Sequence, residues 1–244
     1  QKELSSFANL EIFEGAASHL VIKKGGLQGV TTECKTTFKT RHLVLTVGTF
    51  LNGKIHMGKD KTSGGRKGDA PSIILAQQLL ELAPRTGRLK TGTPPRVLKE
   101  SIDFAGLEEQ RGDEPRPVFS FLSVRADHPK QVSCHITHTN NNTHEVIKGA
   151  LKGSPLFDGS IKGVGPRYCP SIEDKVVRFE DKSRHQIFIE PEGLGSKEVY
   201  PNGISTSLSP ESQGDFLKTI KGFEKAIITQ PGYAIEYDYF DPRD

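Results

Sequence analysis

The sequence of 244 residues has no tryptophan, one methionine and three cysteines. Cys34, Cys134 and Cys169 are odd in number and form no Cys-x-x-Cys pair, so they do not predict a disulfide framework. We therefore expect a reducing cytoplasm as the compartment. No apolar run approaches the roughly 18 residues that cross a bilayer, and residues 1–6 lack the features of a signal peptide. The sequence thus predicts no contact with a membrane.

Two further features, a missing motif and a low hydrophobic fraction, concern how much of a domain the chain contains. The chain has no Gly-x-Gly-x-x-Gly motif, the pattern that opens the first βαβ unit of many dinucleotide-binding domains. Its hydrophobic fraction of 34% is low for a self-contained α/β enzyme. The low hydrophobic fraction agrees with a piece excised from a longer protein.

Short strands separated by glycine and proline dominate the first half of the chain. Residues 10–15, 18–24, 29–37 and 40–47 predict a small β-meander with a turn at residues 25–26. Residues 42–48 are almost continuously apolar and predict a strand buried on both faces. Apolar residues at helical spacing predict a helix over 72–82.

The second half of the sequence mixes both element types. Residues 88–96 are interpreted as a segment that crosses into an inserted region. Strand patterns occupy residues 118–124, 131–139, 176–179 and 185–190. Helices are expected over 144–152 and within 212–229.

The most informative segment, residues 163–175, places one cysteine between two prolines. Pro166 and Pro170 fix φ on either side of Cys169, so the segment predicts a stiff loop. A neighbouring Arg167 or Lys175 would favour the thiolate, which is the nucleophilic form of cysteine. The competing interpretation is that Cys169 is a small buried hydrophobic residue.

Two carboxylates complete this segment. Glu173 and Asp174 are available for proton transfer or for anchoring the loop. Cys169, Arg167, Lys175, Glu173 and Asp174 are therefore the candidate catalytic residues.

Several segments of the chain resemble the MnmG family, also called GidA, of tRNA uridine-modifying flavoproteins. The resemblance extends almost from end to end and rests on residues 43–51, 65–69, 88–96, 165–179, 185–193 and 231–238. It implies an α/β fold: part of a two-dinucleotide-binding flavoprotein, with a Rossmann-like FAD domain, its β-meander and an inserted mixed α+β domain. The expected divisions are a portion of the FAD domain at 1–90, the insertion with the NAD and active-site loop at 91–195, and a return to the FAD domain at 196–244.

The resemblance further implies that the chain is an interior fragment, which lacks the family's N-terminal Gly-x-Gly-x-x-Gly unit and its C-terminal domain and is expected to be inactive alone. It also implies an activity for the parent protein. The parent protein is expected to bind FAD, reduce it with NADH and transfer a one-carbon unit from methylenetetrahydrofolate to C5 of the wobble uridine of tRNA. Glycine or ammonium would supply the amine, giving a carboxymethylaminomethyl or aminomethyl group. An MnmE-like GTPase is the expected partner, and the enzyme is expected to be a homodimer. Cys169 occupies the family position proposed for the thiol that activates the uracil, whereas Cys34 is expected to be structural.

The resemblance assigns further residues to ligands. FAD contacts are expected at Ala17, Gly48, Thr49 and Ser72, for which turn and helix-capping duties are the alternative. The nicotinamide dinucleotide is expected to contact Gly165, Pro166, Arg167, Tyr168, Cys169, Pro170, Ser171, Ile172, Glu173, Asp174, Lys175, Val176, Val177, Arg178 and Phe179. Arg88, Lys90 and Arg96 are candidates for tRNA phosphate or folate carboxylate contacts, although such charge runs are often solvated faces.

Two other functions compete with this one. A folate- and FAD-dependent tRNA (uracil-5-)methyltransferase uses related cofactors, and a non-catalytic RNA-binding module would use the basic residues 85–99. No metal is expected: Cys134 and His138 would share a strand face, but no second close pair completes a zinc site.

Overall fold

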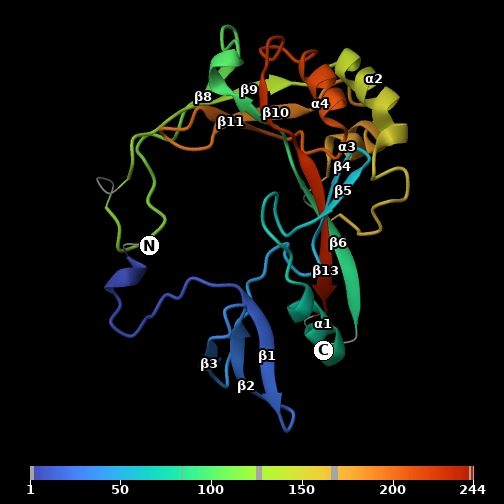
Figure 1. Ribbon diagram of the computed structural model, residues 1–244. Helices are drawn as coiled ribbons and strands as arrows, with labels where there is room; N and C mark the ends of the chain where they lie inside the picture. Colours follow the sequence, from blue (N-terminus) through green and yellow to red (C-terminus); the bar gives the residue numbers. More distant parts are fainter. Residues whose placement is uncertain (1–2, 84, 125–127, 166–169, 242, 244) are drawn as a thin grey trace.

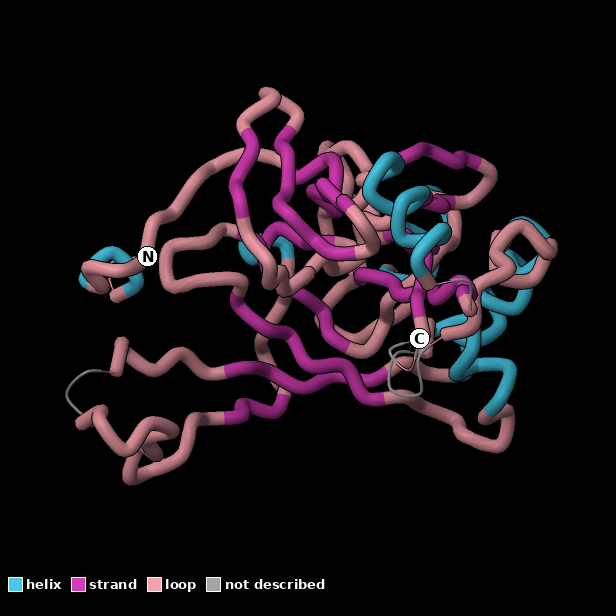
Figure 2. The backbone as a smooth tube through the Cα atoms, turned by 90° about the horizontal axis from the view of Figure 1, so that it is seen from below, coloured by secondary structure: helices cyan, strands magenta, loops and turns pink. Residues whose placement is uncertain are grey.

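The computed structural model describes residues 3–83, 85–124, 128–165, 170–241 and 243. Within these residues the strands form three antiparallel sheets, accompanied by four short α-helices (Figure 1). Figure 2 shows that strands and loops make up most of the backbone, while helices occupy only short segments. No helix in the described part of the chain combines the length and apolar character needed to cross a membrane.

The first sheet is the expected meander, and it lies at the bottom of Figure 1. Its strands pair in the order β1 (Ala17–Lys23), β2 (Gly26–Thr32) and β3 (Thr37–Lys39). The turn at Lys24 and Gly25, with φ of 51° and 74°, allows β2 to fold back on β1. Helix α1 (Ile73–Leu82) lies against β1, where the Gln78 side chain bonds both the N–H and the carbonyl oxygen of Leu20.

The apolar run at residues 42–48 forms no strand in the described structure, so the prediction of a doubly buried strand was wrong. Val44 is 85% exposed, although Leu43 and Val47 pack partly against the small cluster around Leu20 and Leu75. A strand buried on both faces needs neighbours on each side, and no described strand pairs with this run. Residues 10–15 likewise form no strand.

The second sheet joins segments that are far apart in the sequence. Its order is β5 (Asp60–Ser63), β4 (Lys54–Met57), β13 (Tyr233–Phe240) and β6 (Thr86–Thr93). Strands β6 and β13 pair in unbroken register, from Tyr233 opposite Thr93 to Phe240 opposite Thr86, and run side by side through the centre of Figure 1. The expected crossing segment at 88–96 is therefore mostly a strand.

The third sheet lies in the upper part of Figure 1 together with three helices. Its six strands pair in the order β12 (Ile228–Gln230), β7 (Arg96–Leu98), β11 (Glu198–Asn202), β10 (Gln186–Pro191), β9 (Cys134–His138) and β8 (Glu108–Gln110). The accompanying helices are α2 (Asn141–Ala150), α3 (Ile172–Arg178) and α4 (Pro210–Leu217), with 3-10 turns η2 (Lys99–Ser101) and η4 (Leu151–Gly153). A further 3-10 turn, η1 (Leu4–Ser6), lies near the N-terminus, apart from this sheet (Figure 1).

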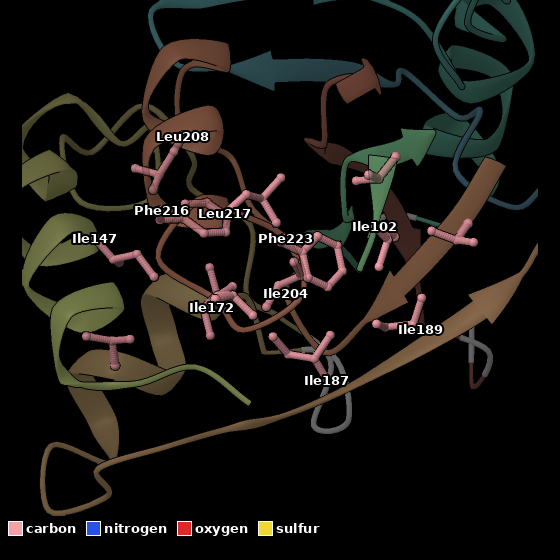
Figure 3. Packing of buried hydrophobic residues seen from close by; sticks show 14 residues of the cluster. Ile102, Ile147, Ile172, Ile187, Ile189, Ile204, Leu208, Phe216, Leu217 and Phe223 are labelled. Carbon is pink, nitrogen blue, oxygen red and sulfur yellow. The ribbon is translucent and has the colours of Figure 1, made fainter. Parts of the chain in front are cut away.

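The larger hydrophobic core lies between this sheet and the helices (Figure 3). Ile187 and Ile189 of β10 belong to one buried cluster with Phe216 of α4 and the following residues Ile220 and Phe223. All five are at most 1% exposed. Capping boxes fix the starts of α2 and α3, so the apolar faces of these helices meet the core in a defined orientation.

The predictions for this half were partly confirmed. Elements of the expected type occur at β9, β10, α2 and α4. Residues 118–124 form no strand: Phe119, Phe121 and Leu122 are almost fully exposed and have no partner strand among the described residues. Residues 176–179 lie mainly in α3 instead of a strand, because the capping box at its start favours a helix.

The sheets also bear on domain organisation. Strands β11 and β12 pair with the six-stranded sheet, and only β13 returns to the four-stranded sheet. We propose that the return to the first region occurs at β13, which is later than the expected boundary at residue 196. The expected boundary after residue 90 stays a prediction.

Replacing a central side chain of the larger core tests how much that core contributes to stability. We expect Phe216→Ala to lower the free energy of unfolding of the full-length protein by about 3–5 kcal/mol, because it leaves a cavity that neighbouring side chains cannot fill. Leu122→Ala, at a 96% exposed side chain, should change it by about 0.5 kcal/mol or less. Urea denaturation measures both values, and equal losses would contradict the assignment of the core.

Candidate functional site

The loop of Cys169 connects two separate parts of the fold. Residues 166–169, which include Arg167 and Cys169, lie outside the described residues. Before them, Val164 forms a parallel bridge with Leu89 of β6, and its carbonyl oxygen accepts the Lys90 N–H at 3.1 Å. After them, Ser171 caps the start of α3. The described ends of the loop therefore lie at β6 and at α3.

Both candidate carboxylates of this segment anchor backbone groups. Asp174 Oδ2 accepts the Ser171 N–H at 3.3 Å and closes the capping box of α3. Glu173 is fully buried, and its Oε1 accepts the N–H and hydroxyl of Ser207 at 2.9 and 3.0 Å. Of the two roles expected from the sequence, the hydrogen bonds of Asp174 Oδ2 and Glu173 Oε1 favour anchoring, while Glu173 Oε2 is buried and has no hydrogen-bond partner among the described residues.

A cavity of about 420 Å³ opens beside the C-terminal end of the loop. Pro170, which directly follows Cys169, forms part of its wall. The basic residues Lys175 and Lys182 and the aromatic residues Phe179 and Phe188 also line it. The remaining wall consists of His185, Gln186, Asn202 and Gly203. Cationic and aromatic groups in one cavity are suited to a planar, anionic ligand.

The residues expected to contact nicotinamide dinucleotide lie in two different environments, the cavity wall and the hydrophobic core. Pro170, Lys175 and Phe179 line the cavity, and Lys175 Nζ also donates to the Gly203 carbonyl oxygen at 2.8 Å. In contrast, Ile172 and Val176 are buried in the core and cannot reach a ligand without unpacking α3. The expected contacts of the 165–179 segment with nicotinamide dinucleotide stay a prediction, and at Ile172 and Val176 such a contact would have to involve the backbone.

His185 was missed as a site residue by the sequence reasoning. Its Nε2 is buried and has no hydrogen-bond partner among the described residues, and its ring lies 5.2 Å from that of His144. Burial, together with the charges of His144 and Lys175, lowers the pKa of His185. In the sequence, residues 185–193 resemble a segment of the family, but this resemblance assigned no role to His185.

The residues expected at FAD lie before the start of α1, in the turn before Phe50 and at the start of β1. Ser72 precedes this helix, donates its N–H to the Phe50 carbonyl oxygen at 2.8 Å and makes no side-chain capping bond. Thr49 donates its hydroxyl to the Gly65 carbonyl oxygen at 2.6 Å, next to Gly48, whose φ is 53°. Ala17 begins β1, the strand against which α1 lies.

The three basic residues expected to contact RNA or folate are engaged within the protein. Arg88 pairs with Asp238 at 2.6 Å, and Arg96 pairs with Glu192 while lying over the Tyr200 ring. Lys90 is 1% exposed and its Nζ lies 3.9 Å from Asp174 Oδ2, and its expected phosphate contact stays a prediction. The charge run in the sequence did not reveal these partners because they come from residues about 100 or more positions away.

Cys34 lies in the turn between β2 and β3 and is exposed, whereas the sequence placed it inside a strand. Hydrogen bonding with the hydroxyl groups of Thr32 and Thr36 lowers the pKa of the Cys34 thiol to about 7. Burial instead raises the pKa of the Cys134 thiol. No group of three or more metal-ligating side chains gathers anywhere in the described ranges.

These two thiols should differ in reactivity. We predict that iodoacetamide at pH 7 alkylates Cys34 of the full-length protein faster than Cys134, because the thiolate is the reacting form. Peptide mass spectrometry measures both rates. Thr32→Val should slow alkylation of Cys34 and leave Cys134 unchanged, and equal rates in the unmodified protein would contradict the assignment.

The half-buried histidine of the cavity should make stability depend on pH. The pKa of His185 is lower in the folded protein than its ordinary value of 6.5. As pH falls through 6.5, the unfolded chain binds a proton that the folded protein does not, so folding stability decreases. We predict that the free energy of unfolding falls between pH 7.5 and 5.5, and falls less in His185→Gln. Exposed His42→Gln is the control, and denaturant titrations at both pH values provide the measurement.

Comparison with known proteins places these observations in a family. The family model of Glucose inhibited division protein A matches residues 1–244. The structure of Aquifex aeolicus GidA in one crystal form is 44% identical with a TM-score of 0.87, and a second form gives 42% and 0.84. Each alignment covers 98% of this chain, but only 41% and 39% of the respective solved chains.

This agreement confirms the expected fold class, because the mixed α/β arrangement with several antiparallel sheets is shared with those structures. The match of the family model over the whole chain and the identity above 40% lead to the same conclusion. The chain belongs to the family of Glucose inhibited division protein A.

Proposed function

We propose that the protein containing this chain is a flavoenzyme that modifies C5 of the wobble uridine in tRNA. Membership of the Glucose inhibited division protein A family supports this activity. The observation that carries it is the position of Pro170 and Lys175: both line the cationic and aromatic cavity, immediately after the loop of Cys169. We assign the chemistry to the full-length protein, since this chain corresponds to 41% of the solved relative.

The proposed role of Cys169 follows from the weak nucleophilicity of uracil C5. A thiolate that adds to C6 forms a C–S bond and moves an electron pair towards C5 and O4. C5 can then attack the electrophilic one-carbon unit derived from methylenetetrahydrofolate. Loss of the C5 proton expels the thiolate and restores the uracil ring, so the thiol is regenerated.

The residues near α1 fit an FAD group. The N-terminus of α1 has no side-chain cap, so its N–H groups are available to an anion, and Ser72 lies at this position. Gly48, Thr49 and Ala17 would complete the contacts. When bound, FAD supplies redox chemistry to the one-carbon unit, with NADH as the reductant.

The cavity beside α3 fits the nicotinamide dinucleotide. Lys175 and Lys182 would meet phosphate groups, and Phe179 and Phe188 would contact a planar ring. The flanking Gly165, Ser171, Val177 and Arg178 belong to the same proposed segment. Arg167, Tyr168, Cys169 and Pro166 remain part of the proposal, outside the described residues.

The proposed partners are tRNA, an MnmE-like GTPase and a second copy of the protein, acting in the cytoplasm. Arg88 and Arg96 stay candidates for tRNA or folate contacts, since each is only half-buried. Glycine or ammonium is the proposed amine source.

Replacing the thiol tests the function directly. We predict that full-length Cys169→Ser, expressed in cells lacking the endogenous enzyme, leaves the wobble uridine unmodified while retaining FAD, because a serine hydroxyl is a far weaker nucleophile. Mass spectrometry of tRNA nucleosides and the flavin absorbance of the purified protein give the two readouts.

The matched control is Cys134→Ser, which removes a thiol that has no role in the proposed mechanism. This variant should leave tRNA modification intact. A C5-methyl product from the unsubstituted enzyme would favour the methyltransferase alternative. Unchanged modification by Cys169→Ser would remove the proposed mechanism and favour a non-catalytic role for the loop.

A further inference from the structure

Strand β13 carries a buried carboxylate that has no role in the proposed chemistry. Glu236 is 5% exposed and lies opposite Lys90 in the pairing of β13 with β6. Its Oε1 accepts the backbone N–H groups of Lys162 and Gly163 at 2.9 and 2.6 Å. These two residues precede the loop of Cys169. One carboxylate oxygen therefore holds two consecutive amides at the entry to that loop.

The other oxygen of Glu236 faces a cation and a histidine. Oε2 lies 3.4 Å from Arg88 Nη2 and 3.6 Å from His56 Nε2. Burial raises the pKa of Glu236, but the hydrogen bond and charge of Arg88, with the N–H groups of Gly163 and Lys162, outweigh it and lower the pKa overall. Burial lowers the pKa of His56, which favours the neutral ring. Glu236 is thus an anion at neutral pH, and charge strengthens its bonds to the amides.

The segment that Glu236 holds lies tightly along the edge of the four-stranded sheet. A Cβ added at Gly163 would lie 2.9 Å from the Leu89 carbonyl carbon and 3.1 Å from Glu236 Cγ. The next residue, Val164, donates its N–H to the Arg88 carbonyl oxygen at 3.1 Å and accepts the Lys90 N–H. Because β6 is the last strand of that sheet, the segment extends the sheet by a short parallel addition.

The other end of the loop is held by a different carboxylate. Glu173 anchors the start of α3 to Ser207, within the region of the six-stranded sheet. The two anchors therefore fix the two ends of the loop to different parts of the fold. Val164 also bonds β6 through its N–H and carbonyl oxygen, so loss of Glu236 would release the amides of Lys162 and Gly163, while Glu173 still holds the start of α3.

We propose that Glu236 is a positioning residue for the loop of Cys169, acting through the amides of Lys162 and Gly163. The inference rests on the proposed function for its effect on turnover. Glu236 touches no reacting atom; it determines where the loop begins relative to α3. Gly163 is required at its position because no side chain fits between Leu89 and the carboxylate.

The test compares Glu236→Ala and Glu236→Gln with Asp238→Asn in the full-length protein. Asp238 is the matched control: it lies on the same strand and pairs with the same Arg88, but bonds no residue of 162–164. Hydrogen exchange of a peptide covering residues 160–165 should rise about tenfold in Glu236→Ala, because both amides lose their acceptor. Glu236→Gln retains an acceptor oxygen and should show a smaller rise.

Kinetics provide the second readout. In Glu236→Ala, kcat for tRNA modification should fall about tenfold or more while KM for tRNA and bound FAD stay nearly constant, because loop position affects the chemical step. Exchange of the β10 peptide, residues 186–191, should not change. A substitution that only lowered overall stability would raise exchange there as well.

Three results would overturn the proposal: unchanged exchange over 160–165 in Glu236→Ala, an equal rise in Asp238→Asn, or a raised exchange with unchanged kcat. If Glu236→Ala does not fold, Glu236→Gln carries the same comparison. Failure of the proposed function is separate, because it appears as unchanged modification by Cys169→Ser, while the exchange measurement still decides whether Glu236 holds the segment.

Discussion

The pairing of β6 with β13 is the interaction on which the remaining structure depends. It joins residues near position 90 to residues near position 236, and β4 pairs with the other side of β13. The segment after β6 continues directly into β7 of the six-stranded sheet. Because β6 is continuous with β7, the β6–β13 pair connects the core around Phe216 with the part of the chain near α1. Both described ends of the Cys169 loop are placed with reference to this pair.

Buried charges follow the same strand pair. Arg88 and Lys90 of β6 lie opposite Asp238 and Glu236 of β13. Removing isolated charges from water is costly, whereas cross-strand partners and backbone amides offset much of that cost. The buried charge of Lys90 Nζ is the least compensated of these. Asp174 Oδ2 lies 3.9 Å away, and no hydrogen-bond partner is present among the described residues. These charges favour one register of β6 against β13, because a shift by one residue would leave buried charges without opposite partners.

Sequence patterns predicted local elements better than distant partners. The hairpin of β1 and β2, helix α1 and strands β9 and β10 follow from periodicity and turn residues near each element. The run at 42–48 has a strand-like pattern but no described neighbour, so pattern alone was insufficient. The start of α3 carried a local capping signal, Ser171 followed by Asp174, that the strand interpretation overlooked.

The candidate site was predictable only in part for the same reason. The segment around Cys169 stands out by its prolines and charges, and Pro170, Lys175 and Phe179 line the neighbouring cavity. Glu236 and His185 could not be assigned roles from sequence, because their importance comes from contacts with residues far away in the chain.

The long sequence interval between β6 and β13 has a consequence for the order of folding. Strands that are distant in sequence must close a large loop before their contacts contribute, and such pairing is slow. On the ribosome, β6 is synthesised long before its partner, so its edge stays unpaired while the six-stranded sheet and its helices are being made. The sheet that anchors the Cys169 loop is therefore completed late, and the entry to that loop becomes ordered only after β13 has emerged.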